Sequence, residues 1–258
     1  TFTVADHYSK TEADTLLAAK ATVANFTSTG IDDNATSTAI TIDSSENVGI
    51  GETSPARFLH VKDPTGGNIV AFFESTDANG SLSIGDNSGS VNVESDAGAM
   101  VLNVNGNTSN GGGLTEAMRI NAAGIVTMPY QPSFRVRATA VITGNNTTHL
   151  HTVEEHDIGN NYNPSTGRFT APIAGVYYFG VQLISNLSTT STEQSIQIRV
   201  NGNSINDARF QGYTTSSAHL KTVVSLAVGD YVTVNNGNSV TAIYGGSYHN
   251  QFMGYLIG

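Results

Sequence analysis

Two histidines, His149 and His151, have the spacing that most suggests metal chemistry in this chain of 258 residues. Side chains two positions apart on a β-strand point to the same face, so both imidazoles would project together. If three copies of the chain met around an axis, six imidazoles facing it could hold a transition metal in an octahedral site. The alternative is that these are surface or interface histidines, because histidine is a common metal ligand but an even commoner bystander.

Paired carboxylates are the other candidates for chemistry, and their spacing is poor. Glu154 and Glu155 are adjacent, as are Asp32 and Asp33. Adjacent residues on a strand point to opposite faces, so neither pair can flank one glycosidic bond. The sequence also lacks a Gly-x-Ser-x-Gly elbow, a phosphate-binding loop and a dinucleotide fingerprint. We therefore predict that the chain is not an enzyme.

The composition restricts the classes of partner. Charged residues make up 12% of the chain and the formal net charge is −10, so a surface that follows phosphates is not expected and nucleic acid is a poor partner. The absence of cysteine excludes disulfides and thiolate metal sites. No apolar run approaches the length that spans a bilayer, so we predict no membrane insertion.

Residues 1–30 differ from the rest of the chain and carry a helix signal. Ser9, followed three residues later by Glu12, forms a capping box in front of good helix formers. We expect a helix from about Lys10 to Ala24. A helix this short is marginal in water, so it should pack against copies of itself as a three-stranded coiled coil. A frayed chain end is the alternative.

Residues 31–130 predict thin β structure with an internal repeat. The segment 42–50 is echoed by the segment 120–128, with apolar residues at the first, seventh and ninth places of each. This echo predicts repeated hairpins. Between them, short stretches alternate apolar and polar residues and are broken by Gly or Asn. Such strands cannot bury enough surface within one chain, so we expect a shaft intertwined with neighbouring copies.

The C-terminal half predicts a β-sandwich. The stretch 163–167, Asn-Pro-Ser-Thr-Gly, has Pro and Gly where a tight turn needs them. Residues 176–184 are dense in aromatic and β-branched side chains and predict a central strand. Gly229-Asp230 marks another turn, with a strand following over residues 231–234. Short strands with Gly and Asn between them favour an all-β sandwich.

Three of these pieces, residues 157–179, 223–234 and 250–258, occur in an order that resembles the C1q-like, tumour-necrosis-factor-like jelly-roll family. The resemblance covers roughly residues 132–258. It implies a jelly-roll head, and family members are usually trimeric binding heads rather than enzymes.

The residues before the head resemble bacteriophage tail fibres. Residues 47–61 are similar to a motif recurrent in fibre shafts, residues 116–126 are similar to another, and residues 8–19 resemble a segment common in such fibres. Together the resemblances imply a mainly β homotrimer with a short helical coiled-coil collar (1–30), a β-rich shaft (31–130) and a C1q-like jelly-roll head (131–258).

The implied function is that of a viral tail-fibre protein, extracellular in the virion, whose head recognises the host bacterium during adsorption. The expected partners are two further copies of the chain, upstream fibre or tail proteins, and a bacterial surface glycan or outer-membrane protein. Two alternatives stay open: a structural spacer without receptor contact, and a fibre adhesin of a predatory bacterium.

The resemblance also implies where a receptor would bind. The family fold places both ends of the head at its base, so three connections, at about 186–194, 211–218 and 236–249, should lie at the tip. The candidate receptor-binding residues on them are Glu193, Gln211, Tyr213, Tyr244, Tyr248 and His249. Tyrosine offers a flat apolar face with a polar end, although packing at the trimer interface or on the sandwich is the alternative.

We expect no resident cofactor. A metal ion on the trimer axis, held by His149 and His151, and a calcium ion at the tip are weaker possibilities. Glu193 is the main carboxylate of the tip, so a calcium cage would need backbone carbonyls and amides to complete it.

Overall fold

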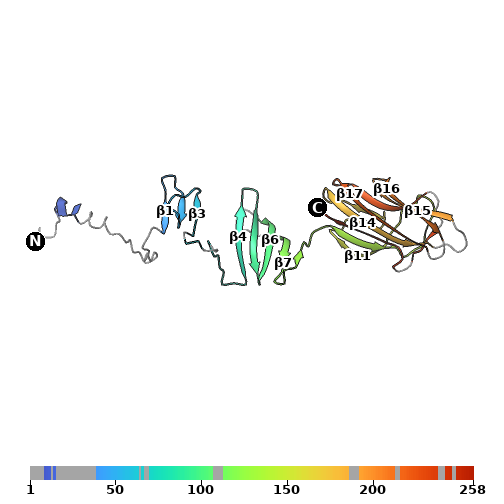
Figure 1. The fold of residues 1–258 in the computed structure, drawn as a ribbon, viewed down its shortest axis with the longest axis horizontal. Helices are drawn as coiled ribbons and strands as arrows, with labels where there is room; N and C mark the ends of the chain where they lie inside the picture. The colour runs from blue at the N-terminus through green and yellow to red at the C-terminus, as the bar shows by residue number, and fades with distance from the viewer. Residues whose placement is uncertain are drawn as a thin grey trace, which may run out of the picture. The chain divides into compact units, whose positions relative to one another are not determined.

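The computed structural model describes residues 9–12, 14–15, 39–63, 65–66, 70–106, 113–185, 192–212, 216–237, 242–245 and 248–258 (Figure 1). Backbone contacts divide the chain into two compact units, Thr1–Glu74 and Ser75–Gly258, and each is described by itself. The structure is mainly β, as the sequence predicts. In the ranges given above, no helix is long and apolar enough to cross a membrane. The predicted boundaries at residues 30 and 130 stay a prediction.

The first described element is the start of a helix, with residues 10–12 and 14–15 helical. The predicted capping box is present in full. The backbone N of Glu12 donates to Oγ of Ser9 over 3.2 Å, and the backbone N of Ser9 donates to Oε2 of Glu12 over 2.8 Å. The rest of the expected helix, to Ala24, lies outside the described residues.

The N-terminal unit also contains a small sheet of three strands: β1 (Ile40–Ile42), β2 (Val48–Ile50) and β3 (Leu59–Val61). β1 and β2 form an antiparallel hairpin, and β3 runs parallel to β2. Ile42 opens the repeated segment and its side chain is 72% exposed. An apolar side chain this open indicates a face that the single chain does not bury.

The turn of this hairpin is built on Asp43. Its carboxylate Oδ1 accepts hydrogen bonds from the backbone N of Ser45 (2.8 Å) and of Asn47 (3.0 Å). Its backbone N donates to the carbonyl of Asn47, and its carbonyl accepts from the backbone N of Glu46. Glu46 takes a left-handed conformation, with φ of 62°. The turn therefore satisfies its own backbone groups around one side chain.

The turn at Asn121 has the same construction. Its Oδ1 accepts from the backbone N of Ala123 (3.0 Å) and of Ile125 (2.9 Å), and its backbone N donates to the carbonyl of Ile125. Its carbonyl accepts from the backbone N of Gly124, which has φ of 80°. Each bond has its counterpart two, three or four residues after Asp43. The echo in the sequence is therefore a structural repeat, and the predicted hairpins are confirmed at both places.

The second hairpin belongs to a larger antiparallel sheet, in which five strands lie in chain order: β4 (Asn79–Gly85), β5 (Ser90–Asp96), β6 (Ala99–Gly106), β7 (Thr115–Ile120) and β8 (Val126–Thr127). One row of side chains crosses four of them in register. Leu82 lies opposite Val93, Val93 opposite Leu102, and Leu102 opposite Met118. Leu82 and Val93 are exposed, and Leu102 and Met118 are half-buried. One face of this sheet therefore presents an open apolar row.

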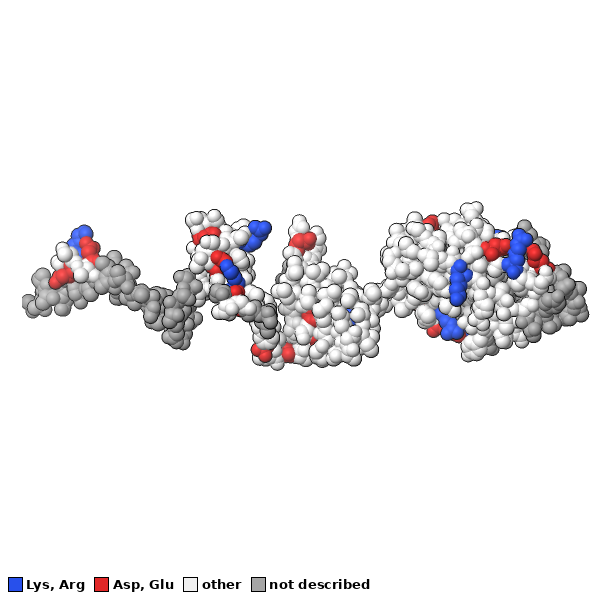
Figure 2. All heavy atoms as spheres, viewed as in Figure 1, with Lys and Arg blue, Asp and Glu red and all other residues white. Residues whose placement is uncertain are grey.

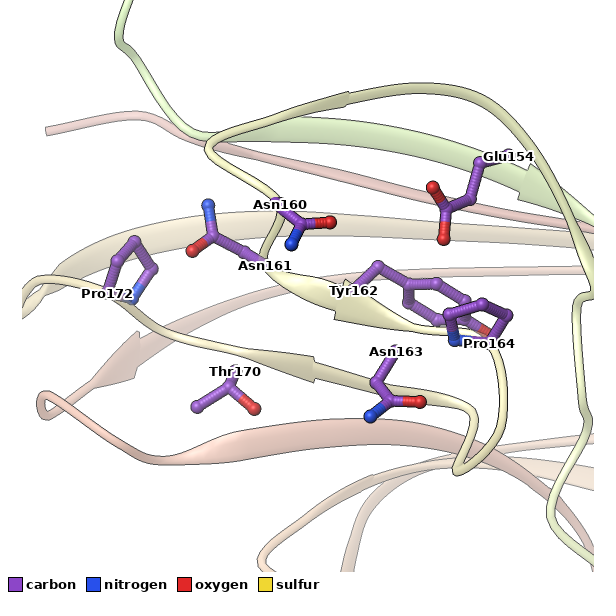
Figure 3. Close-up of a pocket in the computed structure, with 8 residues that line it drawn as sticks. All are labelled: Glu154, Asn160, Asn161, Tyr162, Asn163, Pro164, Thr170 and Pro172. Carbon is purple, nitrogen blue, oxygen red and sulfur yellow. The ribbon is translucent and has the colours of Figure 1, made fainter.

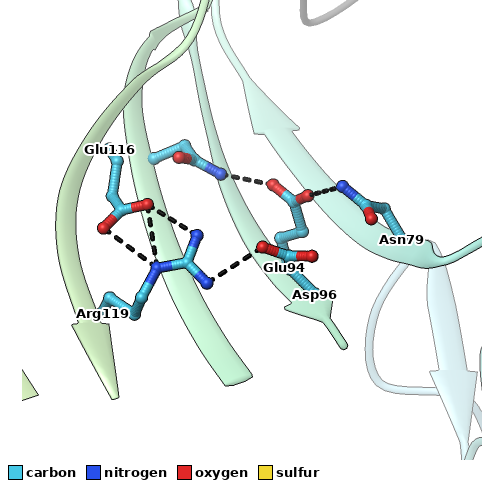
Figure 4. A network of polar contacts seen from close by, with 6 residues as sticks. Asn79, Glu94, Asp96, Glu116 and Arg119 are labelled. Atoms are coloured by element: carbon cyan, nitrogen blue, oxygen red, sulfur yellow. Dashed lines mark hydrogen bonds and ion pairs between the residues drawn. The ribbon is translucent and has the colours of Figure 1, made fainter. Parts of the chain in front are cut away.

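The other face carries a polar network (Figure 4). Arg119 forms ion pairs with Asp96 over 2.9 Å and with Glu116 over 2.7 Å. Glu94 accepts hydrogen bonds from the side chains of Asn79 and Asn103, each over 2.6 Å. Hydrogen bonds from Arg119 lower the pKa of Glu116. The sheet thus has one face held by polar contacts and an apolar face that is left open.

The C-terminal part contains two sheets of five antiparallel strands. The first has the order β11 (Val153–Ile158), β9 (Ser133–Arg137), β20 (Gln251–Leu256), β14 (Gly175–Ile184) and β17 (Ser217–Leu226). The second has the order β12 (Tyr162–Asn163), β13 (Arg168–Thr170), β18 (Tyr231–Asn236), β15 (Thr192–Val200) and β16 (Asn203–Gly212). A short pair, β10 (Ile142–Thr143) with β19 (Ala242–Ile243), completes it. The chain crosses repeatedly between the two sheets, which makes a jelly roll.

Aromatic rings hold the two sheets together. Phe134 on β9 stacks on Phe169 of β13 with ring centroids 4.8 Å apart, and meets Phe252 edge to face at 4.9 Å. Gly254 leaves room for these rings. A Cβ at this position would lie 2.6 Å from Cδ1 of Phe179 and 2.8 Å from Cε1 of Phe134. The closing strand therefore requires glycine where two aromatic rings lie against its backbone.

Candidate binding site at the tip of the head

Strand register defines the two ends of the head. Arg137 lies opposite Gln251, which lies opposite Gln182. Gly175, at the other end of β14, lies by the chain end, since the backbone N of Val176 donates to the carbonyl of Gly258. We call the end marked by Arg137, Gln182 and Gln251 the tip. The connections after β14, β16 and β18 leave the sandwich there, in agreement with the placement expected from the sequence.

A fourth connection lies at the tip and was not expected. Because Val153 pairs with Arg137, residues 138–152 also belong to this end, and we call them the tip segment. Its strand β10 pairs with β19. A Cβ on Gly245 would lie 1.9 Å from the backbone of Ala140, so this glycine allows the two segments to touch.

Three of the predicted residues gather near β20. The rings of Tyr244 and His249 meet edge to face, with centroids 5.1 Å apart. The guanidinium of Arg137 lies 5.5 Å from the centre of the Tyr248 ring, and Gln251 donates to the carbonyl of Tyr248 over 2.7 Å. Tyr244 is 41% exposed and Tyr248 is 62% exposed. These side chains therefore offer aromatic surface beside one cation.

Two other predicted residues lie on the second sheet. Glu193 on β15 is directly opposite Gln211 on β16. Its carboxylate forms an ion pair with Arg209 over 3.0 Å, and Arg209 also contacts Asp207. Across the described parts of the tip, no hydrogen bond, ion pair or ring contact joins this pair to the group at Tyr248. Tyr213, the remaining candidate, lies outside the described residues.

The predicted arrangement of His149 and His151 is wrong. Both side chains are completely buried inside one protomer, and not on a surface or an axis that copies could share. Nε2 of His149 lies 2.7 Å from Oδ1 of Asn236, and Nε2 of His151 lies 3.0 Å from Oδ1 of Asn250. Amide oxygens only accept hydrogen bonds, so Nε2 of each ring carries its proton and is not free for a metal.

The buried pair is neutral. Burial lowers the pKa of His149 to about 4. In His151, burial together with the neighbouring His149 lowers the pKa to about 3. The hydroxyl of Tyr162 lies 3.4 Å from Nδ1 of His151 and accepts a hydrogen bond from its backbone N. The two histidines therefore act as polar packing that joins the tip segment to the sandwich.

The sequence contained a signal for this role that was not recognised. Thr148 and Leu150 are at least partly exposed while His149 and His151 are buried, which is the alternation of a strand with its histidines inward. In the described ranges, no three His, Asp or Glu side chains come together as a metal site. At the tip, the expected calcium ligand Glu193 is paired with Arg209.

The face of the molecule drawn in Figure 2 carries scattered charged side chains among a majority of uncharged ones.

The adjacent carboxylates of Glu154 and Glu155 do not form a catalytic pair. The carboxylate of Glu155 is bound by Arg135 and Arg137. The tip thus offers aromatic and hydrogen-bonding surface, which suits recognition.

The strand order and the aromatic core define a jelly-roll β-sandwich of the C1q and tumour-necrosis-factor type. The C1q domain family matches residues 133–257, which supports a C1q-like fold for the head. Such domains commonly form homotrimers and are generally not enzymes.

Comparison with known proteins gives similarity over part of the chain. Complement C1q tumor necrosis factor-related protein 3 of Homo sapiens is 33% identical over 112 residues, which are 40% of this chain and 42% of that protein, and the Mus musculus protein of the same name gives the same figures. The match thus spans about two fifths of the length of these curated relatives.

Among solved structures, the globular domain of zebrafish complement 1qA protein is 19% identical and covers 50% of this chain and 98% of its own, with a TM-score of 0.41. Eiger TNF from S. frugiperda is 11% identical and covers 50% of this chain and 94% of its own, with a TM-score of 0.41.

Proposed function

We propose that the chain is a trimeric bacteriophage tail-fibre protein whose C-terminal head recognises a receptor on the host bacterium during adsorption. The C1q domain supports binding, and its curated relatives are animal proteins, so the fibre part of the proposal rests on the residues before the head. The observation that carries it is the repetition of the Asp43 hairpin at Asn121, with the same hydrogen bonds to the backbone of the turn. Repeated hairpins of this kind, in segments that resemble fibre shafts, fit a stalk that supports a binding head.

Assembly as a homotrimer is supported first by the five-stranded sheet. Its apolar row runs from Leu82 to Met118 with nothing in the described part of the chain covering Leu82, which is 47% exposed. Burial of apolar surface contributes about 25 cal/mol for each Å² removed from water, so copies that pack these rows together gain stability. We infer that another copy of the chain covers this apolar row, because the head that follows resembles domains that commonly form homotrimers.

The head itself presents a second apolar row. Tyr255 lies opposite Tyr178, and Tyr178 opposite Val223, on the face of the first sheet that points away from the core. The two tyrosine rings lie 5.1 Å apart, and Val223 is 59% exposed. An aromatic row with a polar end on each ring suits a subunit interface.

Three heads held together would present three copies of each tip. Tyr244, Tyr248 and Arg137 provide flat rings and one cation, which suit a surface glycan or the loops of an outer-membrane protein. Weak contacts at three equivalent sites combine through effective concentration. Such a tip can hold a particle on a cell while each single contact stays weak.

The test is binding of the purified full chain to intact cells of candidate hosts. Saturable binding is expected, and a chain that ends near Tyr130 should lose it. Within the head, Tyr244→Ala combined with Tyr248→Ala should reduce binding, because it removes the exposed rings of the tip. Tyr130→Ala is the control, since Tyr130 is also an exposed tyrosine but lies before the head.

A structural spacer would give a different result. It would retain full binding after truncation, or would bind no host that the parent particle infects. Either outcome would remove the receptor-binding role from the head.

A further inference from the structure

A pocket of about 520 Å³ opens at one edge of the sandwich, away from the predicted tip residues. It is lined by residues of β11 in the first sheet, by β12 and β13 in the second, and by the connections between them (Figure 3). Its size lies in the range of small-molecule sites, which is roughly 300–1,000 Å³. Edge strands of both sheets therefore contribute to one hollow.

A carboxylate is free to act in this pocket. A β-bulge between Glu154 and His156 inserts Glu155 as an extra residue in β11. The carboxylate of Glu155 is occupied by Arg135 over 3.1 Å and by Arg137 over 3.3 Å. The carboxylate of Glu154 points into the pocket instead, and no described residue forms an ion pair or hydrogen bond with it (Figure 3). The bulge thus gives the two neighbouring glutamates different roles. Glu155 forms ion pairs within the sheet, and Glu154 can bind a ligand in the pocket.

Two amides add hydrogen-bond donors. Asn160 is exposed, takes a left-handed conformation with φ of 55°, and has no hydrogen bond to its side chain from the described residues. Asn163 uses Oδ1 to accept from the backbone N of Ser165 over 2.9 Å, which leaves its NH₂ group facing the pocket. Asp157 holds the loop by accepting from the backbone N of Tyr162 over 2.8 Å. The loop that carries these amide donors is therefore held in place by hydrogen bonds to Asp157.

The rest of the lining mixes the polar Asn161 and Thr170 with two prolines and a tyrosine, and it carries no positive charge. Pro164 and Pro172 lie at opposite ends of the pocket, and the ring of Tyr162, which is largely buried, lies beside Pro164 (Figure 3). No lysine or arginine lines it, so a phosphate or carboxylate ligand is not favoured. A single carboxylate also falls short of a calcium site, which needs six to eight oxygen ligands.

We propose that this pocket binds a neutral pyranose unit of a glycan. A sugar hydroxyl both donates and accepts, so neighbouring hydroxyls can donate to Glu154 and accept from the amides of Asn160 and Asn163. The two proline rings suit the apolar C–H faces of the sugar. This site does not depend on the proposed fibre function, because none of its residues is among the candidate receptor-binding residues of the tip.

The test uses the full chain in saturation-transfer NMR and calorimetric titration. The probes are glucose, galactose, mannose and N-acetylglucosamine, with a carboxylated peptide as a non-sugar ligand. At least one sugar should bind saturably, and Glu154→Gln should weaken its Kd roughly tenfold, because a charge-assisted hydrogen bond becomes a neutral one.

Two further variants separate loss of the site from loss of the fold. Asn160→Gly keeps the left-handed backbone and removes only the amide, so it should weaken binding while thermal unfolding stays unchanged. Glu74→Gln makes the same chemical change outside the head and should bind like the parent, as should Tyr248→Ala at the tip. The proposal would be overturned if no sugar bound saturably, or if only the peptide bound. It would also be overturned if Glu154→Gln and Asn160→Gly both bound the sugar as tightly as the parent chain does.

Discussion

Nε2 of His149 and Oδ1 of Asn236 lie 2.7 Å apart in a fully buried contact that ties the tip segment to the end of β18. The other end of the same amide donates to the carbonyl of Gly144 over 2.8 Å. One side chain therefore fastens the tip segment at two points. Residues that present the tip to a partner depend on this internal contact.

Acid should destabilise the head through its buried histidines. An unfolded histidine titrates near pH 6.5, whereas the folded pKa values are about 4 for His149 and about 3 for His151. The unfolded state therefore binds more protons in this window, so the stability present above about pH 6.5 falls as the pH drops towards the folded pKa values.

Thermal unfolding of the full chain, measured from about pH 7 to about pH 4, checks this expectation. His149→Gln retains a donor for Asn236 but removes one titrating group, so its melting temperature should fall less steeply with pH. An unchanged slope in that variant would contradict the role given to the pair.

Removing the amide should leave a buried donor without a partner. Asn236→Ala is expected to reduce the free energy of unfolding by about 1–3 kcal/mol, because the Nε2 proton of His149 loses its acceptor. Chemical denaturation followed by circular dichroism measures the loss. Asn203→Ala, an exposed asparagine on β16, should have little effect. Equal stability of the two variants would contradict the account.

The glycine of the closing strand should not tolerate a side chain. In Gly254→Ala the new Cβ would lie 2.6 Å from the Phe179 ring, so the core must shift at a cost of about 1–3 kcal/mol. Gly258→Ala is the control, because nothing lies within 4 Å of a Cβ there. Comparable melting temperatures for the two variants would show that the core is looser than its contacts indicate.

The apolar row of the five-stranded sheet should be needed for assembly. Leu82→Asp places a charge in the row and should shift the trimer towards monomers, as measured by multi-angle light scattering. Ser83→Asp adds the same charge on the opposite face of β4 and should leave the mass unchanged. If the parent chain proved to be a stable monomer, the proposed homotrimer would be contradicted.

Local signals were sufficient to predict much of the fold. The capping box at Ser9 and the hairpins at Asp43 and Asn121 depend on residues within four positions of one another, so the sequence displays them directly. The aromatic strand at 176–184 and the turn at 163–167 predicted the sandwich for the same reason. The placement of the tip follows from strand alternation once the jelly roll is assumed.

Long-range and irregular features were not predictable in the same way. β10 pairs with β19 across about a hundred residues, and nothing near Ile142 announces that partner. The inward histidines were misjudged because their partners, Asn236 and Asn250, are equally remote. The bulge at Glu155 breaks the alternation that a sequence argument assumes, so the edge pocket was not anticipated.

The Asp43 and Asn121 hairpins close their turn hydrogen bonds within five residues. Each turn therefore depends on residues close to it in the chain and not on distant partners. It also accepts either glutamate or glycine at its left-handed position, as Glu46 and Gly124 show. A hairpin of this kind can therefore recur along the chain with different side chains at its left-handed position.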